Sequence, residues 1–522
     1  MKYLMIILIS IYLIFEGLFF LQMLQQNSYN DKNRFLVFVL KNIKENLNYY
    51  ALKLLFAISF LLFNSFEQIL YIYFFTVCFI LIYSSIIQYR KHNKKLPLVF
   101  TFRIYRISFL LLALYFSLLI LFINDNLCHL LGYLLLYISL VPFILIIIIY
   151  ILTPIEKLIY VIYKNKALKK LVKMGNIIVI GITGSFGKTS TKMILNDILS
   201  IKYKGFATAA SFNTPKGIIK TINETDTIFN DYFIAEMGAR KKGEIKELCK
   251  LVHPQYGIIT SIGHAHLETF KNIENITNTK FELLENLNDN GLIILNKDNE
   301  YERDYKAHKK VKKLWFGINN KADAYADNIK FSSKGTTFDL YLKKQKINVS
   351  TILLGKENVY NILAASLLGY EMGLSLDQIK LGIKNIKPIP HRLEIKKNGT
   401  TTIIDDSYNS NPVGAENALS VLKLMSGKKV IITPGMVEMG KKEQELNYEF
   451  GEKMANICDK FYLIGKKRST PISDGILKNN KNANVKVFNS FNEAYNCFVK
   501  EYENQKVTVL IENDLPDTYT EK

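Results

Sequence analysis

The chain has 522 residues, 49% of them hydrophobic, which is enough for two or three domains with sizeable apolar cores. Its formal net charge is +21, but basic charge alone is weak evidence for nucleic-acid binding, and we expect no nucleic-acid partner. The five cysteines are scattered and form no CxxC pair, so neither a disulfide framework nor a zinc site is indicated.

Long apolar runs occupy the N-terminal part of the chain, up to residue 152. Five of them approach the roughly 20 residues that cross a hydrocarbon core. The first lacks a small-residue cleavage site, and further spans follow it, so we expect an uncleaved anchor rather than a signal peptide. The predicted spans lie near residues 3–23, 49–66, 69–88, 107–123 and 128–152.

Positive charge between the spans predicts their orientation, because Lys and Arg are enriched in cytoplasmic loops. The turns "NSFEQ" and "NDN" carry no basic residue. We therefore expect a multi-pass protein of the cell membrane, with its N-terminus outside and the rest of the chain after the spans in the cytoplasm. The basic residues follow the first span (Lys32, Arg34, Lys41, Lys44) and the third (Arg90, Lys91, Lys94, Lys95, Arg103, Arg106).

Residues 153–173 are basic, with apolar residues at helical spacing. This pattern predicts an amphipathic helix that lies on the membrane surface and leads into the remainder of the chain. From residue 174 onward, apolar segments alternate with Lys, Asp, Glu and Asn, as in an α/β protein.

The stretch "GITGSFGKTSTKMIL" (181–195) is typical of a phosphate-binding loop, since it joins an apolar strand (176–180) to a helical pattern. Its glycines, Gly181, Gly184 and Gly187, let the backbone approach phosphate oxygens closely. Lys188 can reach the outer phosphates, and the Thr189 hydroxyl, followed by Ser190, can bind Mg²⁺. The first glycine stands one residue further from GKT than in the usual G-x-x-x-x-G-K-[ST] pattern.

Three later stretches could complete a nucleotide site. "DYFIAEMGA" (231–239) is an apolar strand that ends in Glu236, a plausible Mg²⁺ ligand. "YGIITSIGHAHLETF" (256–270) carries His264 and His266, and "NTKFELLENL" (278–287) places Lys280 on a helix. Each residue alone is more often a solvated side chain without a function. Their order after a phosphate loop favours the functional interpretation.

In these motifs the sequence resembles the Mur ligases, the ATP-dependent amide ligases of bacterial cell-wall precursor synthesis, whose phosphate loop has this longer form. The resemblance covers about residues 174–522 and is strongest to the member that adds D-alanyl-D-alanine to UDP-N-acetylmuramoyl-tripeptide. It rests further on "FNTPKGI" (212–218), "GKENVYNILAA" (355–365), "PHRLE" (390–394) and "IDDSYNSNP" (404–412).

The resemblance implies roles for individual residues. Lys188 and Thr189 would hold the phosphates and Mg²⁺, and Glu236 and His266 match further metal-binding positions. Lys280 matches a lysine that is carbamylated and helps to bind a second Mg²⁺. In the family, a carboxylate attacks ATP to give an acyl phosphate, which an amine then displaces. The remaining nucleotide-site matches are Gly184, Gly187, Ser190, Asn358, Asn361, Arg392 and Asp406, with Arg392 reaching the phosphates from the next domain.

The sequence departs from the family pattern in three places. Glu357 stands where the family reads His in G-x-H-N, and "ITPGMVEMGKKEQELN" (432–447) follows the family only loosely. The apolar spans also occupy the place of the family's soluble N-terminal domain, which holds the UDP part of the substrate. The ligase chemistry is therefore easier to transfer than the substrate.

We expect a transmembrane domain (1–152), the basic segment (153–173), an ATP-binding central domain (174–388) with a mostly parallel sheet, and a Rossmann-like α/β C-terminal domain (389–522). The predicted activity joins an amino-acid or dipeptide amine to a carboxylate, which a nucleotide-linked or lipid-linked muramoyl peptide would supply. Alternatives are a ligase of polyglutamate or folylpolyglutamate type, a membrane transport or signalling ATPase, and a silent scaffold.

Overall fold

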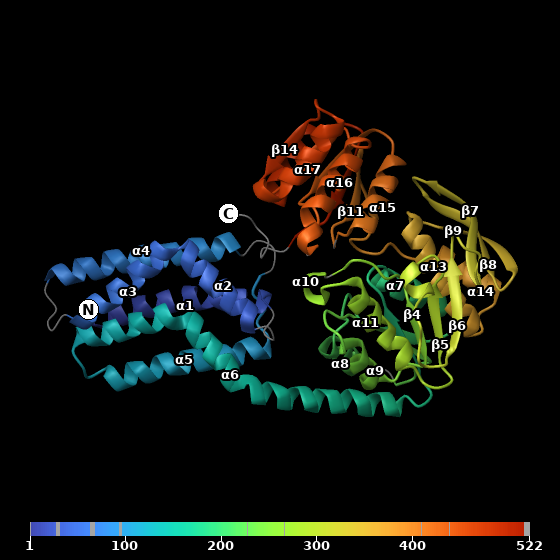
Figure 1. Cartoon of the computed structure of the whole chain (residues 1–522). Coiled ribbons are helices and arrows are strands. Elements are labelled where there is room, and N and C mark those ends of the chain that lie inside the picture. Colours follow the sequence, from blue (N-terminus) through green and yellow to red (C-terminus); the bar gives the residue numbers. More distant parts are fainter. Residues whose placement is uncertain are drawn as a thin grey trace. The chain divides into compact units, whose positions relative to one another are not determined.

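A computed structural model of the chain describes residues 2–27, 32–62, 68–92, 97–226, 228–265, 267–408, 410–437 and 439–515. The chain divides into two compact units, which are described separately: an N-terminal unit up to Ile159 and a second unit from Tyr160 to Leu515 (Figure 1).

The N-terminal unit is a bundle of apolar helices, and a large cluster of buried aliphatic and aromatic side chains fills its interior. In the part of the chain that the structure describes, α1, α5 and α6 are long and apolar enough to cross a membrane, whereas α3 and part of α4 are shorter apolar helices. Membrane spanning therefore stays a prediction. The helices are α1 (Lys2–Gln26), α2 (Lys32–Glu45), α3 (Leu47–Leu62), α4 (Gln68–His92), α5 (Phe102–Phe122) and α6 (Leu127–Lys173).

Two features of this unit differ from the sequence pattern. The basic segment after the first predicted span contains the additional helix α2. The fifth predicted span and the basic segment 153–173 form the single helix α6, which continues through Pro142 and Pro154. A proline removes one backbone hydrogen bond and weakens the helix locally, but it does not end a helix whose neighbouring turns remain bonded. Here the Thr153 hydroxyl also donates to the Ile149 carbonyl, 2.7 Å away.

A charged pair is buried inside the N-terminal bundle. Glu16 on α1 and Lys53 on α3 form an ion pair, and each side chain is only 1% exposed. The second oxygen of Glu16 accepts hydrogen bonds from Ser85 at 3.0 Å and Tyr49 at 3.3 Å. The Lys53 ammonium also lies 4.8 Å from the centre of the Tyr50 ring. Each charge is therefore compensated by hydrogen-bonded or aromatic neighbours, as a buried charge requires.

The second unit begins with a mostly parallel sheet. Its strands are β1 (Ile178–Thr183), β2 (Gly205–Ala207), β3 (Tyr232–Glu236), β4 (Tyr256–Ile259), β5 (Leu292–Asn296), β6 (Lys312–Gly317), β7 (Ala324–Ser332), β8 (Gly335–Leu342) and β9 (Gln345–Thr351). Among the described residues the order of these nine strands is β2-β3-β1-β4-β5-β6-β7-β8-β9, and only the pairs β7–β8 and β8–β9 are antiparallel.

Helices cover both faces of this sheet because its strands alternate their buried side chains between two cores. On one face of the sheet, Ile180 and Ile182 of β1 pack with the helices α7, α13 and α14. On the other face, Val179 of β1 packs with α8, α9 and α11 (Figure 1). The helices are α7 (Lys188–Leu199), α8 (Pro215–Glu224), α9 (Glu244–Val252), α10 (Leu267–Phe270), α11 (Ile273–Glu285), α12 (Glu300–Arg303), α13 (Lys356–Glu371) and α14 (Leu376–Lys384).

A smaller sheet follows the segment 386–393. It has the order β10-β11-β15-β12-β13-β14 within the described residues, and β10 alone pairs antiparallel. Its strands are β10 (Glu394–Asn398), β11 (Thr401–Asp406), β12 (Lys428–Thr433), β13 (Lys460–Ile464), β14 (Val485–Phe488) and β15 (Val507–Glu512). Its helices are α15 (Pro412–Lys423), the 3₁₀ turn η1 (Gly440–Lys442), α16 (Glu443–Ala455), α17 (Lys466–Asn479) and α18 (Phe491–Glu501). The expected mixed α/β class is confirmed for this unit.

Candidate active site

The phosphate loop lies where the strand order of the large sheet reverses, since β1 has β3 on one side and β4 on the other. In open α/β sheets, ligands bind at the carboxyl ends of the strands at such a point. The loop 184–187 joins β1 to the N-terminus of α7, whose unpaired N–H groups favour an anion. Gly187 has φ +79°, and a Cβ there would lie 2.6 Å from the Asn361 side chain. A larger residue would therefore be both strained and obstructed.

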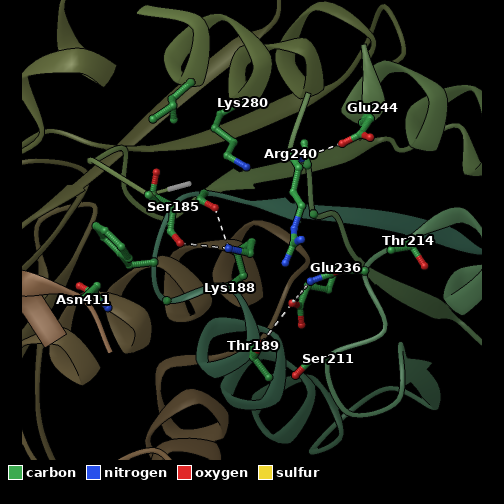
Figure 2. Close-up of a pocket in the computed structure, with 18 of the residues that line it drawn as sticks. Ser185, Lys188, Thr189, Ser211, Thr214, Glu236, Arg240, Glu244, Lys280 and Asn411 are labelled. Carbon is green, nitrogen blue, oxygen red and sulfur yellow. Dashed lines mark hydrogen bonds between the residues drawn. The ribbon is translucent and has the colours of Figure 1, made fainter. Parts of the chain in front are cut away.

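The Lys188 side chain curls over this loop. Its ammonium donates to the carbonyl oxygens of Gly184 at 2.8 Å and Ser185 at 3.1 Å (Figure 2). Burial lowers the pKa of Lys188 to about 8, with the charge of Arg392 contributing in the same direction. A phosphate bound in the loop would compensate the positive charges of Lys188 and Arg392, so Lys188 is suited to bind phosphate.

Glu236 ends β3 directly beside the loop, and its side chain is 1% exposed. Its Oε1 atom accepts from the Thr189 hydroxyl and from the Asn213 amide, each at 3.2 Å. Two oxygens that both bind one Mg²⁺ at 2.0–2.1 Å in adjacent octahedral positions lie about 2.9 Å apart. The Thr189 and Glu236 oxygens therefore fit the donor chemistry and the spacing that Mg²⁺ requires.

A cavity of about 470 Å³ opens in front of these groups. Figure 2 shows Lys188, Arg240 and Lys280 directed toward the same space. Lys280 on α11 is 3% exposed, and its ammonium lies 5.8 Å from the Phe270 ring. Burial and the charge of Lys188 lower the pKa of Lys280 to about 7. Residues in the segments that precede or follow strands of the smaller sheet complete the wall: Arg392, Tyr408, Ser410, Asn411, Val437 and Met439.

Arg392 is held between two residues with left-handed backbone conformations, His391 at φ +59° and Leu393 at φ +49°. Its guanidinium stacks 4.4 Å from the centre of the Tyr408 ring. The Leu393 amide donates to Asp406 at 3.1 Å, and this bond ties the segment to the end of β11. Strain in a bulky residue such as Leu393 persists only where the surroundings impose it. The fold therefore fixes the direction of Arg392.

A second cavity of about 270 Å³ shares Phe186 and Gly187 with the first. The predicted Asn361 lines it and accepts from the Thr191 hydroxyl at 3.0 Å, while Asn358 donates to the Leu354 carbonyl at 2.8 Å. The remaining wall includes Asp298, Asn319, Glu357 and Tyr360. Asn361, one of the two asparagines predicted for the nucleotide site, thus lies beside the phosphate loop, although it comes from α13, far along the chain.

Most residues singled out from the sequence meet around these two cavities. His264 is exposed and lines the second cavity. His266, which the sequence suggested as a metal ligand, lies outside the described residues. Sequence reasoning missed Lys192 and Arg240. A spacing of four residues from Lys188 on a helix that starts at the loop is the signal that could have found Lys192.

Two family models match the second unit. One, described as the Mur ligase middle domain, matches residues 182–369, and the other, described as the Mur ligase, glutamate ligase domain, matches residues 391–511.

Curated relatives carry the description UDP-N-acetylmuramoyl-tripeptide–D-alanyl-D-alanine ligase. The Escherichia coli protein is 33% identical over 293 residues, which are 55% of this chain and 64% of the relative, just under two thirds of its length. The protein from Buchnera aphidicola (Baizongia pistaciae) is 30% identical over 351 residues, 65% of this chain and 75% of the relative.

Solved structures show the same similarity. MurF from Acinetobacter baumannii matches with a TM-score of 0.62 and 25% identity over 68% of this chain and 77% of its own. The MurF ligase of Thermotoga maritima in complex with ADP shares the fold, with a TM-score of 0.59 and 24% identity over 67% of this chain and 80% of its own.

Proposed function

Because the chain belongs to the Mur ligase family of ATP-dependent amide-bond-forming ligases, we propose that it joins a dipeptide amine to the carboxylate of a muramoyl peptide in peptidoglycan precursor synthesis. The substrates follow from the relatives, whose description names a UDP-muramoyl tripeptide and D-alanyl-D-alanine. One observation carries the proposal: Lys188, Glu236, Lys280 and Arg392 all line one cavity beside the phosphate loop.

The geometry suits the activation of a carboxylate by ATP. The phosphates would lie in the loop, with Lys188 and Arg392 on the oxygens that gain charge during phosphoryl transfer. The base and ribose would occupy the second cavity, which Asn361 and Glu357 line. The acceptor carboxylate would enter the first cavity opposite the loop, where Arg240 and Lys280 offer positive charge.

The metal site of this proposal consists of Thr189 and Glu236, with His266 and Lys280 as further positions. Bound Mg²⁺ supplies charge neutralisation for the transferred phosphoryl group. Thr189 and Glu236 contribute the oxygen ligands, and their hydrogen bond shows that they already lie together.

Carbamylation of Lys280 is a further part of the proposal. A carbamate forms only on a neutral amine, and burial of Lys280 favours the neutral form at the pH of the cytoplasm. Among the described residues, its ammonium has no hydrogen-bond acceptor and lies over the Phe270 ring. Addition of CO₂ to the neutral amine, with release of a proton, would give a carbamate whose carboxylate is suited to a second Mg²⁺.

The N-terminal unit is proposed to anchor the enzyme in the cell membrane. The second unit, from Tyr160 to Leu515, carries the ligase site and is proposed to lie in the cytoplasm; it is called the ligase unit below. Large apolar side chains remain exposed on the surface of the N-terminal unit, among them Phe79, Phe109 and Ile120, each at 70% or more. Exposed apolar surface of this kind marks contact with a membrane or another protein. The unit would either present a lipid-linked acceptor or keep the enzyme beside other envelope enzymes.

The alternatives are not favoured. Three curated relatives at 30% identity or more carry the description UDP-N-acetylmuramoyl-tripeptide–D-alanyl-D-alanine ligase. A folylpolyglutamate synthase shares the fold at 12% identity, which supports no shared substrate. A transport or signalling ATPase would have no need of the second matched ligase domain.

The test is an assay of the purified full-length protein in detergent, with ATP, UDP-muramoyl tripeptide and D-alanyl-D-alanine. We expect ATP consumption that requires the carboxylate acceptor, an acyl phosphate that hydroxylamine traps when the amine is omitted, and an amide product when it is present. Glutamate in place of the dipeptide tests the polyglutamate alternative. ATP hydrolysis that needs neither acceptor nor amine would contradict the ligase proposal.

A further inference from the structure

Lys192 is a buried cation on α7, one helical turn after Lys188, and its side chain is 2% exposed. Its ammonium lies 3.0 Å from Oε2 of Glu236 and also donates to the Ala210 carbonyl. A lysine is almost never buried this completely unless it is paired. We therefore attribute the burial of the Lys192 ammonium to its ion pair with Glu236.

The ion pair divides the Glu236 carboxylate into two edges. Oε2 faces Lys192, whereas Oε1 accepts from Thr189 and Asn213. Fixing Oε2 leaves Oε1 directed at the Thr189 hydroxyl, which is the second oxygen of the proposed metal site. Without a metal, Lys192 is also the cation that compensates the buried carboxylate.

Lys192 is also bonded to the loop between β2 and α8, residues 208–214. The Ala210 carbonyl accepts its second hydrogen bond, and Ala210 has φ +41°, which is uncommon for an alanine. The same loop contacts Glu236 at two further points, because the Thr208 hydroxyl accepts from the Glu236 amide at 3.1 Å and Asn213 donates to its carboxylate. Ser211, Asn213 and Thr214 of this loop line the first cavity.

We propose that Lys192 is the resident counter-ion of Glu236 and a positioning residue that couples the metal site to the loop 208–214. This inference rests on the proposed function for the metal. Lys192 balances the charge of the Glu236 carboxylate and fixes its orientation before the metal binds, and shares the carboxylate with the metal afterwards. The Lys192 ammonium weakens Mg²⁺ binding, because both cations are attracted to the Glu236 carboxylate and repel each other. The hydrogen bond from Lys192 to the Ala210 carbonyl holds the loop 208–214, which forms part of the cavity wall, in a fixed position relative to the phosphate loop.

The sign of this effect gives a decisive experiment with Lys192→Met in the full-length protein. Mg²⁺ is titrated in saturating ADP while the thermal midpoint is recorded. We expect the midpoint without Mg²⁺ to fall by roughly 5–10 °C, because Glu236 loses its partner. We expect the Mg²⁺ concentration at half-saturation to fall roughly tenfold, because the competing charge is gone. Lys453→Met is the matched control, since it removes an exposed ion pair with Glu416 and should change neither value.

Two further variants keep the test informative if Lys192→Met folds poorly. Glu236→Gln should abolish the Mg²⁺ response, and Lys192→Met combined with Glu236→Gln should recover at least half of the lost midpoint, because no charge is then left buried alone. Lys192→Arg should keep the wild-type Mg²⁺ response. Hydrogen exchange of residues 207–214 should be faster in Lys192→Met and should stay fast when Mg²⁺ is added.

The outcomes separate the two proposals. If the wild-type protein shows no Mg²⁺-dependent shift, the metal site of the proposed function is wrong, and the counter-ion inference falls with it. If the wild-type protein responds but Lys192→Met binds Mg²⁺ equally or more weakly, only the counter-ion inference is overturned. Absence of coupling between Lys192→Met and Glu236→Gln would overturn it as well.

Discussion

Asp406 and Glu512 are paired in register on the neighbouring parallel strands β11 and β15, so their carboxyl groups lie on the same face of the smaller sheet. Glu512 is 1% exposed, and its Oε1 accepts from the Ser410 hydroxyl at 2.6 Å. Burial raises the pKa of both groups, and the charge of Asp406 raises that of Glu512 further. Burial and the repulsion between the two carboxylates therefore favour a pair that shares one proton.

Replacing Glu512 with Gln should make stability less dependent on pH. In the wild-type protein, the folded state binds more protons than the unfolded state above about pH 4.5, so the free energy of unfolding falls as pH rises through the raised pKa values. An amide donates to Asp406 without titrating. The difference in thermal midpoint between Glu512→Gln and the wild type should shift in favour of the variant by roughly 2–6 °C as the pH rises from 5 to 8. Calorimetry measures both midpoints. The exposed control Glu224→Gln should run parallel to the wild type, and parallel curves for Glu512→Gln would contradict the shared proton.

The fold of the second unit follows from the sequence because its signals are local. The apolar strand 176–180, the glycines after it and the helical pattern from Lys188 predict β1, the loop and α7, and the structure has these elements. The order of the strands could not be predicted, since it depends on contacts between segments far apart in the sequence. In the N-terminal unit, apolar runs predict helices, but the proline in "TPIEK" does not reveal that α6 continues to Lys173.

The site was predictable only where a residue belongs to a motif. Glu236 and Lys280 could be singled out because Glu236 ends an apolar strand and Lys280 lies on a helical pattern after a phosphate loop. Lys192, Glu512 and the pair Glu16–Lys53 were missed, because a charged residue within an apolar pattern is equally compatible with a solvated face. Their partners lie 44, 102 and 37 residues away in the chain, respectively. Only the folded structure brings these side chains together.

Lys188→Ala should abolish acyl-phosphate formation with little effect on folding. The ammonium contacts two loop carbonyls, so its loss leaves no buried charge without a partner. Removing a group that stabilises the charge of a transition state costs about 10²–10³-fold in rate. Hydroxylamine trapping measures the intermediate, and thermal denaturation measures the fold. Lys202→Ala removes an exposed ammonium that donates to the Gly373 carbonyl and is the control. A rate within threefold of the wild type would remove Lys188 from the mechanism.

Lys280 should carry a carbamate that increases with pH. Because its pKa is lowered to about 7, the neutral amine that reacts with CO₂ is more abundant at pH 8 than at pH 6. In ¹³C-bicarbonate, the wild-type protein should show a carbamate resonance that is stronger at pH 8 and is absent from Lys280→Arg. Lys280→Ala should lose ligation, and short-chain carboxylates should restore part of it. Full activity of Lys280→Ala, or no carbamate at either pH, would contradict this role.

The buried pair in the N-terminal unit should be costly to break but cheaper to replace. Lys53→Met leaves the Glu16 carboxylate buried with only Ser85 and Tyr49 as donors, a loss of about 3–5 kcal/mol. Lys53→Met combined with Glu16→Gln removes both charges and should recover most of this stability. The measurement is the thermal midpoint in detergent, with Lys41→Met, whose pair with Glu45 is exposed, as the control. Additive effects of the two changes would show that the ion pair does not couple α1 to α3.

The last prediction separates anchoring from catalysis. A truncated protein should begin at Tyr160 rather than after α6, because Ala167 packs into the core of the ligase unit and Lys170 donates to the Asn223 carbonyl at 3.0 Å. We expect the full-length protein to float with liposomes and the truncated protein to stay in solution, since the exposed apolar side chains of the N-terminal unit are then absent. Every residue that lines the first cavity lies within the ligase unit, so the truncated protein should ligate a soluble UDP-muramoyl tripeptide as fast as the full-length protein does. A full-length protein that stays out of the liposomes would contradict the anchor. Ligation that requires both the N-terminal unit and a lipid-linked muramoyl peptide would show that this unit takes part in binding the acceptor.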